Sequence, residues 1–248
     1  MNSNEAMNPD LYPDLFAAGG LGAALERLAA GLGVALTVVP HAGRTSRSAG
    51  IASSVPGRKA LSVSIAAEER FFIVSGWREG IESVTGGTTD PAEVVLAGVA
   101  WGRGAPLREL ETRFSFLRVG ERAKAAERGP AAVVALQWRD LRRRAAGAPD
   151  VPEFGDLVEA AHAEPRLRQL YVFSSHWTLG FSSCTGYPFR TEVAIAPALG
   201  GSPYRVMQRP YGTAIGEAAT AGEAVAFAVS RLPDDLGPAV AGTAEDAG

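Results

Sequence analysis

The stretch GIESVTGGTTDPAEVVLAGVAWGRG, residues 80–104, holds the pattern that decides the fold. It begins as a short strand, continues through a turn of small residues and ends in an apolar helical segment. Asp90 is a favourable N-cap, Pro91 occupies the first helical position, and Glu93 stands where a capping box places its acid. The stretch therefore predicts a strand, a turn and a helix in direct succession.

The same plan recurs in GTAIGEAATAGEAVAFAVSRLP, residues 212–233. Thr220 and Glu223 stand 130 positions after Asp90 and Glu93, and they form a second capping box in the sequence. Repetition at one offset indicates an internal duplication. The helix that follows has an apolar stripe at helical spacing, made of Ala224, Val225, Ala228, Val229 and Leu232.

Each of these patterns has a helix and strands before it. Residues 21–33 and 153–167 are predicted helices, and strand-like segments separate each of them from its strand–turn–helix pattern. The sequence therefore predicts an α+β protein of two duplicated α-β-β-β-(β)-α units, each an antiparallel sheet with helices packed on one face. We expect a first unit at 14–120, connecting helices and a linker at 121–152, a second unit at 153–236 and a disordered tail at 237–248.

Charge argues against nucleic acid as a partner. The chain has a net charge of −3 and a pI near 5.7, so it creates no general field that attracts polyanions. An α-β-β-β-α order also occurs in double-stranded-RNA-binding domains, which need a basic face at a helix start. The predicted helix after Thr220 has no Lys or Arg before Arg231, so RNA binding is not expected.

Composition limits the chemistry further. One cysteine excludes an internal disulfide, and three scattered histidines do not favour a metal site. The motifs H-E-x-x-H, G-x-S-x-G and C-x-x-C are absent from the sequence, and we expect no cofactor. No apolar run approaches the ~20 residues that span a bilayer, and the first residues do not resemble a secretion signal. We therefore expect a cytoplasmic protein without a membrane partner.

The stretch FSSHWTLGFSSCTGYPF, residues 173–189, holds one of the three histidines and the only cysteine. Residues 171–183 alternate as one strand, which would place Trp177 in the core and His176 on a polar face. His176 would be a general base if that face lines a cleft, where Gly180 leaves room for a ligand, and a surface histidine if it faces solvent. The candidate catalytic residues are His176, Ser174, Thr178, Ser182 and Tyr187.

A Cys–His pair within this stretch is not expected. Along one extended strand, the eight positions from His176 to Cys184 span roughly 26 Å. Cys184 is therefore expected to be a buried, unreactive thiol. The turn that follows offers Tyr187 and Arg190 as a donor and a cation at a sheet edge.

Residues 40–59 form a second unusual segment, a long basic loop. No acid occurs between His41 and Ala67, and a loop of this length without structure of its own is uncommon. Its arginines could bind a carboxylate, a phosphate or an acidic peptide segment, or they could simply be solvated. The candidate substrate-binding residues are Arg44, Arg47, Arg58, Arg190 and Trp177.

The second half resembles a known family. The likeness lies in LVEAAHAEPRLRQLYVFSSHWTLGFSSCTGYPF and GEAATAGEAVAFAVSRLPDDLGPAVAGT, with VVALQWRDL (residues 133–141) as a further match. These segments resemble an actinomycete family of unknown function whose members are commonly labelled natural product biosynthesis proteins. The resemblance covers about the last hundred residues. It implies work beside assembly or tailoring enzymes, and no reaction or catalytic residue.

Two functions follow as expectations. The first is a cofactor-free tailoring enzyme, for example a cyclase that uses acid–base chemistry on a peptide-like intermediate. The second is a non-catalytic module that binds a peptide or a partner and presents substrate to other pathway enzymes, for example by strand addition at a sheet edge. The two differ in whether His176 and its polar neighbours face a pocket or open solvent.

Overall fold

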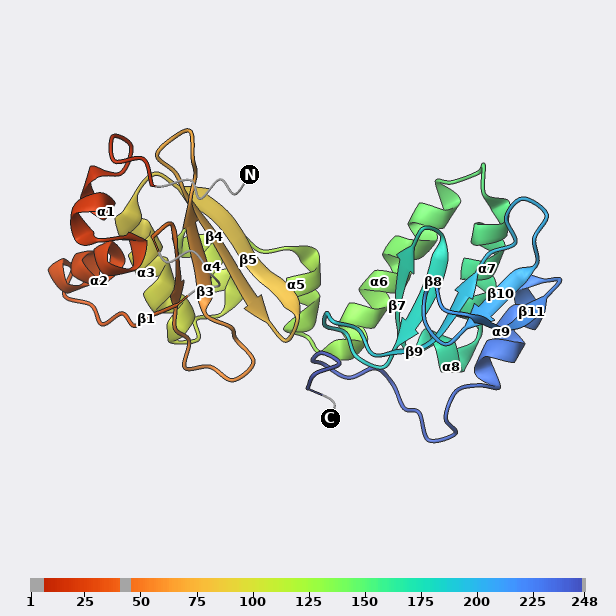
Figure 1. The fold of residues 1–248 in the computed structure, drawn as a ribbon. Helices are drawn as coiled ribbons and strands as arrows, with labels where there is room; N and C mark the ends of the chain where they lie inside the picture. Colours follow the sequence, from red (N-terminus) through yellow and green to blue (C-terminus); the bar gives the residue numbers. More distant parts are fainter. Residues whose placement is uncertain (1–6, 41–45, 247–248) are drawn as a thin grey trace. The chain divides into compact units, whose positions relative to one another are not determined.

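The computed structural model describes residues 7–40 and 46–246, and the chain divides into two compact units (Figure 1). The first unit is Met1–Lys124 and the second is Ala125–Gly248. The division falls within the short helix α5 (Glu121–Ala126). The long helix predicted in the connecting region therefore belongs to the second unit.

Each unit is built on one antiparallel sheet whose strands follow one another in sequence order. Most neighbouring strands are therefore joined directly by loops, whereas two helices stand between the last two strands of the first sheet. The fold class is the predicted one, α+β with two similar sheets. The first sheet contains β1 (Val38–Val39), β2 (Ser48–Ile51), β3 (Leu61–Ile65), β4 (Phe72–Arg78), β5 (Ile81–Thr88) and β6 (Leu117–Arg118). The second contains β7 (Tyr171–Ser175), β8 (Thr178–Ser182), β9 (Thr191–Ala196), β10 (Tyr204–Met207) and β11 (Ala214–Ala218).

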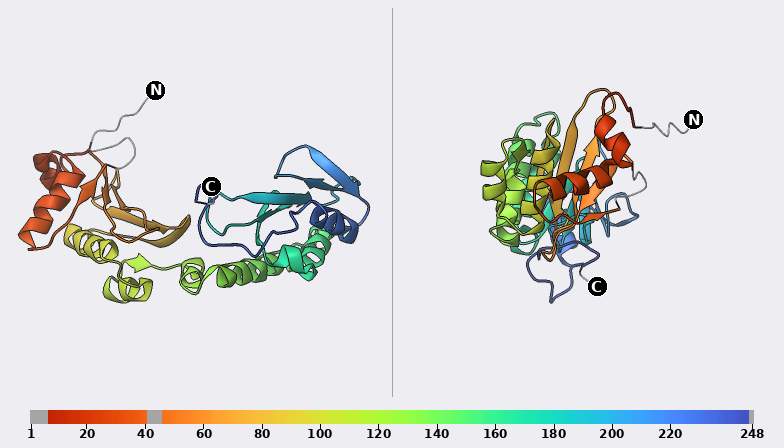
Figure 2. Two further views of the ribbon diagram at one scale, coloured as in Figure 1. Left: turned by 90° about the horizontal axis from the view of Figure 1, so that it is seen from below. Right: turned by 90° about the vertical axis from the view of Figure 1, so that its left-hand side faces the viewer.

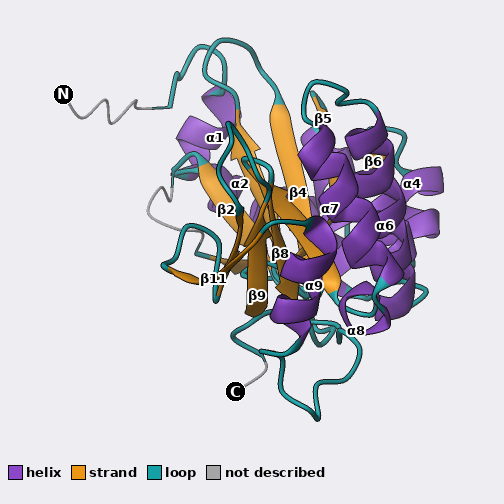
Figure 3. Ribbon diagram, turned by 90° about the vertical axis from the view of Figure 1, so that its right-hand side faces the viewer, coloured by secondary structure: helices purple, strands orange, loops and turns teal. Residues whose placement is uncertain are grey.

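Within each unit, helices pack on the sheet (Figure 2). In the second unit α7 and α9 lie side by side (Figure 3). The helices of the first unit are α1 (Pro13–Ala18), α2 (Leu21–Gly31), α3 (Pro91–Gly102) and α4 (Leu107–Arg113). Those of the second are α6 (Pro130–Ala146), α7 (Pro152–Ala163), α8 (Pro165–Arg168) and α9 (Ala221–Val229).

The two helix starts that the sequence paired do begin where predicted, although their caps differ. At α9 the capping box is complete, because Thr220 and Glu223 each accept from the other's backbone N–H. At α3 Asp90 accepts from the N–H of Ala92, while the Glu93 carboxylate accepts from the hydroxyl of Thr88. Helix α3 therefore has an N-cap, but its Glu93 does not complete a capping box.

The predicted basic loop at residues 40–59 is partly a strand. Residues Ser48–Ile51 form β2, which pairs with β1 on one side and β3 on the other. Ala49 and Ile51 are buried beneath the helices, which explains why this polar-looking segment is held in the sheet. Gly50 permits the close approach of Val39 from β1.

The predicted disordered tail is wrong for the described residues 237–246. Val240 forms a parallel bridge with Cys184, and its N–H donates to the carbonyl of Ser183 at 2.9 Å. Ala239 and Thr243 are buried against the second unit. Small and polar residues suggested disorder, but their backbone groups are bonded to the loop between β8 and β9.

Candidate functional site

The chain reverses at His176 and Trp177, so the single strand predicted for residues 171–183 is wrong. Strands β7 and β8 form a hairpin around these two residues, with Ser175 opposite Thr178. His176 and Trp177 both have positive φ, 45° and 69°. Two-residue hairpin turns of the primed types favour positive φ, and Asn-Gly is their usual sequence. A His-Trp pair carries no such signal, which is why the turn was not predicted.

The reversal changes which side chains share a face of the sheet. Residues on either side of the turn pair directly, so Ser175 and Thr178 lie on one face and Ser174 and Leu179 on the other. The Ser174 face is the helix face, because the Ser174 hydroxyl accepts from Arg144 of α6 at 2.8 Å. Ser174 is therefore on the opposite face from Thr178, whereas one alternating strand would have put both on the face of His176.

Three strands place a row of side chains on the face opposite the helices. Thr178 begins β8, and the β8–β9 register puts it beside Ala196, which pairs with Arg205 of β10. These residues line a pocket of about 390 Å³ that also includes His176 and Tyr211. The guanidinium of Arg205 makes no hydrogen bond or ion pair with any described residue. Glu217 lies opposite Arg205 in the β10–β11 ladder, and the unbonded guanidinium donors of Arg205 can still meet an anionic group in the pocket.

Tyr211 joins His176 at the rim of this pocket. The Nδ1 atom of His176 lies 2.7 Å from the Tyr211 hydroxyl, which donates to the Ser175 hydroxyl at 2.6 Å. A tyrosine hydroxyl has one proton. With that proton directed to Ser175, we expect the Nδ1 atom to donate to Tyr211, which would leave the Nε2 atom of His176 with its lone pair.

Backbone strain is concentrated at the same cluster. Tyr211 has a φ of 61°, so three of the four described non-glycine residues with positive φ belong to or adjoin the cluster. Left-handed conformations are unfavourable for residues with a Cβ atom and persist where the surroundings impose them. A register irregularity between Val206 and Met207 precedes the loop that carries Tyr211. The loop brings Tyr211 to His176 in the β7–β8 turn.

Ser175, Arg205 and Tyr211 were not predicted from the sequence. Tyr211 lies in QRPYGT, a stretch with the Pro and Gly residues of a turn, so a loop could be expected there. Its contact with His176 depends on how the loop folds over the sheet. The position of Arg205 in the pocket depends on the β9–β10 register, which cannot be predicted from sequence alternation.

Ser182 and Cys184 form a buried hydrogen-bonded group away from the pocket. The Ser182 hydroxyl donates to the carbonyl of Cys184 at 2.8 Å, and the Cys184 sulfur accepts from the N–H of Arg190 at 3.2 Å. Both side chains are fully buried. Arg190 itself forms an ion pair with Glu192 at 3.5 Å. These hydrogen bonds hold the loop between β8 and β9 in place.

Tyr187 and Gly180 also lie outside the pocket. Tyr187 is 67% exposed and its ring contacts that of Phe189. Gly180 was predicted to leave room for a ligand, but the ring of Phe173 occupies that space, and a Cβ atom at Gly180 would collide with it. Phe173 in turn stacks on Phe189 with ring centroids 4.7 Å apart.

The predicted substrate-binding arginines of the first unit have different surroundings where the structure describes them. Arg44 lies outside the described residues. Arg58 is buried, with its guanidinium 4.5 Å above the ring of Trp101 and donating to the carbonyls of Trp101 and Ala105. It therefore caps the end of α3. Arg47 lies next to β2, half-buried at the start of that strand.

Trp177 is not the predicted core residue. It is 37% exposed at the hairpin turn, and its ring meets that of Phe154 edge to face at 5.1 Å. Phe154 belongs to α7, so Trp177 fixes the turn against the helix layer. It does not line the pocket with His176.

Among the described residues, no group of three or more His, Cys, Asp or Glu side chains could hold a metal ion. Within that same part of the chain, none of the helices has the length and apolar character to cross a membrane.

The pocket and its polar cluster lie in a stretch of chain that a family model matches. Residues 132–243 form a DUF6193 domain. The model carries the description "Family of unknown function (DUF6193)". The matched residues include the three segments on which the family resemblance rests. No curated protein and no solved structure matches the chain.

Proposed function

We propose that the DUF6193 domain is a cofactor-free tailoring enzyme, for example a cyclase, that uses acid–base chemistry on a peptide-like intermediate of natural-product biosynthesis. The observation that carries this proposal is the 2.7 Å contact between His176 and Tyr211 at the rim of a pocket of about 390 Å³. The natural-product setting rests on the family resemblance in the second half of the chain.

Each member of the cluster has a role in the proposed reaction. His176 accepts a proton at Nε2, while Tyr211 and Ser175 hold its Nδ1 atom in the donating tautomer. Arg205 binds an anionic group of the intermediate, such as a carboxylate. Thr178, almost fully buried at the base of the pocket, offers a hydroxyl that can donate to a carbonyl oxygen.

Replacement of the chromosomal gene by His176→Ala and Tyr211→Phe variants in the native host tests this proposal. Loss of a general base lowers the rate by about 10²–10⁴-fold, so an unconverted intermediate with a mass different from the product should accumulate. Arg209→Gln, an exposed change outside the pocket lining, is the matched control. If both variants yield the normal product at the normal level, the acid–base proposal is rejected.

A binding function is the second candidate, because β11 is an edge strand. Strand β11 (Ala214–Ala218) pairs only with β10 among the described strands, and Ile215 on it is 37% exposed. An extended peptide could add to this edge through main-chain hydrogen bonds. In that case the His176→Ala host should still make the same product, while Ile215→Pro, which introduces a residue without an N–H, should lower its yield.

A further inference from the structure

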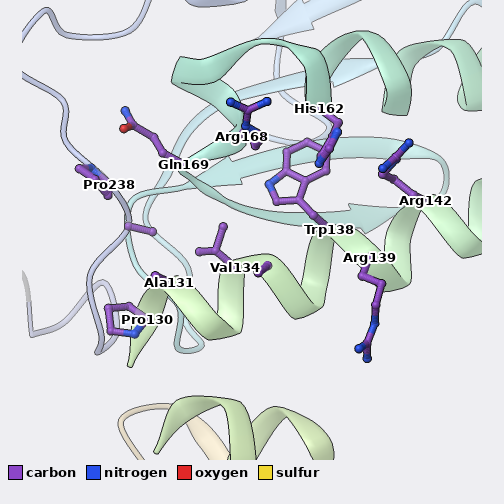
Figure 4. A pocket seen from close by; sticks show the side chains of 12 residues that line it. Pro130, Ala131, Val134, Trp138, Arg139, Arg142, His162, Arg168, Gln169 and Pro238 are labelled. Atoms are coloured by element: carbon purple, nitrogen blue, oxygen red, sulfur yellow. The ribbon is translucent and has the colours of Figure 1, made fainter. Parts of the chain in front are cut away.

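A second pocket lies on the helix side of the DUF6193 domain, away from the cluster around His176. It is bounded by α6, by the α7–α8 region and by the segment after α9, and it has a volume of about 550 Å³ (Figure 4). This volume is in the range of small-molecule sites. It shares no lining residue with the pocket of His176. Its apolar lining residues are Pro130, Ala131, Val134, Ala135, Trp138, Pro238 and Ala239.

The indole nitrogen of Trp138 has no hydrogen-bond partner among the described residues. Trp138 is 2% exposed, and its Nε1 atom is fully buried. Figure 4 shows this nitrogen on the edge of the ring that faces the space between Val134 and Gln169. An indole N–H can only donate, and buried donors almost always have an acceptor. An acceptor supplied by a ligand would satisfy it.

The indole ring is held in this orientation from two sides. His162 of α7 packs edge to face on it with ring centroids 5.3 Å apart, and Phe181 of β8 lies at 6.2 Å. The N–H direction is therefore set by the contacts of α6 with α7 and with the sheet. Such fixed donors at the base of an apolar pocket are typical of small-molecule sites.

The charged residues that line the pocket are all basic. The lining includes Arg139, Arg142 and Arg168 and no acid. Arg142 makes a bidentate ion pair with Glu159, and Arg139 is next to the carboxylate of Asp140. The guanidinium of Arg168 has no hydrogen bond or ion pair with any described residue. Arg168 is therefore the cation available to a ligand.

We propose that this pocket binds a small carboxylic acid with an apolar body. The apolar body lies against Val134 and Pro238, an oxygen of the ligand accepts from the Trp138 indole, and the carboxylate pairs with Arg168. His162, the other titratable group at the pocket, adds no charge near neutral pH, because burial and the nearby Arg142 lower its pKa.

Binding of decanoate to the full chain, with decanol as the uncharged control, tests the inference. In ¹H–¹⁵N spectra the Trp138 indole signal, assigned through Trp138→Phe, should shift downfield as decanoate is added. Loss of one hydrogen bond to a charged or neutral oxygen should weaken decanoate binding by about 2- to 10-fold in Trp138→Phe. No shift of the indole signal at saturating decanoate overturns the proposal.

Two further variants separate the pocket from the charge. Ala135→Trp places a large ring at the exposed lip and should abolish binding of both probes, even if Trp138→Phe does not fold. Arg168→Gln should weaken decanoate about 10-fold and leave decanol unchanged, whereas Arg143→Gln, an exposed arginine of α6 outside the lining, should change neither. Equal effects of Arg168→Gln and Arg143→Gln would overturn the assignment of the carboxylate. Unchanged binding to Ala135→Trp would overturn the assignment of the pocket.

Discussion

His176 and Tyr211 meet at 2.7 Å although 35 positions separate them in the chain. His176 is in the turn between β7 and β8, and Tyr211 is in the loop between β10 and β11. The contact therefore bridges the sheet across β8, β9 and β10. Among the described residues that line the pocket, only these two non-glycine residues have positive φ.

The tautomer of His176 is the first prediction. In its neutral form the ring should carry its proton on Nδ1, because that atom donates to Tyr211. Long-range ¹H–¹⁵N spectra distinguish the two ring nitrogens directly. Tyr211→Phe removes the acceptor and should shift the balance toward the Nε2-protonated form. A neutral ring already protonated on Nε2 in the unaltered protein would contradict the assigned hydrogen bonds.

Trp177 should contribute less to stability than its size suggests. Its ring is 37% exposed, whereas Phe181 in the same hairpin is fully buried. We expect Phe181→Ala to lower the free energy of unfolding by about 3–5 kcal/mol and Trp177→Ala by about 1–2 kcal/mol, mostly from the contact with Phe154. Trp177→Gly should cost less than Trp177→Ala, because glycine adopts positive φ without strain. Urea unfolding of the three variants checks the order.

The sequence predicted the regular parts of the fold well. Asp90 and Thr220 mark the starts of α3 and α9, because N-capping is a local interaction that a few residues specify. The two antiparallel sheets were also predicted, although the order of their strands was not. Common descent of the two units stays a prediction that superposition of the two sheets can test.

The site was only partly predictable, for physical reasons. His176 and Thr178, two of the predicted candidates, line the pocket, but the predicted alternation continued through a turn that His-Trp does not signal. The error put residues before the turn on the wrong face relative to those after it, so Ser174 was separated from Phe181, with which it shares the helix face. Tyr211 and Arg205 come from other strands, so their approach depends on sheet register and loop path, which local pattern cannot give.

His162 should make the stability of the second unit depend on pH. Burial, together with Arg142 of α6 and Arg168 of α8, lowers its pKa below 6.5, and Glu159 of α7 opposes this only in part. Below pH 6.5 the unfolded chain therefore binds more protons than the folded one, so the free energy of unfolding should fall as the pH falls from 6.5 through the folded pKa. Well above pH 6.5, where the ring is neutral in both states, the residue adds no slope.

Thermal melts of the full chain between pH 7 and pH 5 check this dependence. His162→Gln should flatten the curve in that window, while the ordinary titration of Glu159, whose pKa is lowered by the hydrogen bond from Arg142, lies below it. An unchanged slope in His162→Gln would assign the pH dependence to other groups.

Arg58 should act as a structural residue of the first unit. Its guanidinium donates to two backbone carbonyls at the end of α3 and lies over Trp101. Hydrogen bonds from a charged group contribute about 1.5–3 kcal/mol, so Arg58→Gln should lower the stability of this unit by about 2–3 kcal/mol. Arg27→Gln, on the exposed side of α2, should stay within about 0.5 kcal/mol. The urea midpoints of the two variants are compared. If Arg58→Gln leaves the midpoint unchanged, Arg58 is again a candidate for substrate binding.

The segment after α9 should protect Cys184 from reagents. Val240 bridges to Cys184 through the backbone, and the thiol has no exposed surface. Removal of residues 239–248 should therefore make Cys184 react with a thiol reagent such as dithionitrobenzoate, while the intact chain reacts only on unfolding. Circular dichroism of the truncated chain shows whether the fold persists. Equal reaction rates in the two chains, both folded, would mean that other residues shield the thiol.

The burial of Cys184 also makes the chain suitable for spectroscopic labelling. It is the one cysteine in the sequence and it is fully enclosed, so a second cysteine placed on the surface would be the single site that takes a dye or a spin label. A label at position 135 would sit at the lip of the pocket beneath Trp138, and one at position 209 would sit near the loop of Tyr211. Each pocket could then be followed separately in a mixture of metabolites, before any substrate has been identified.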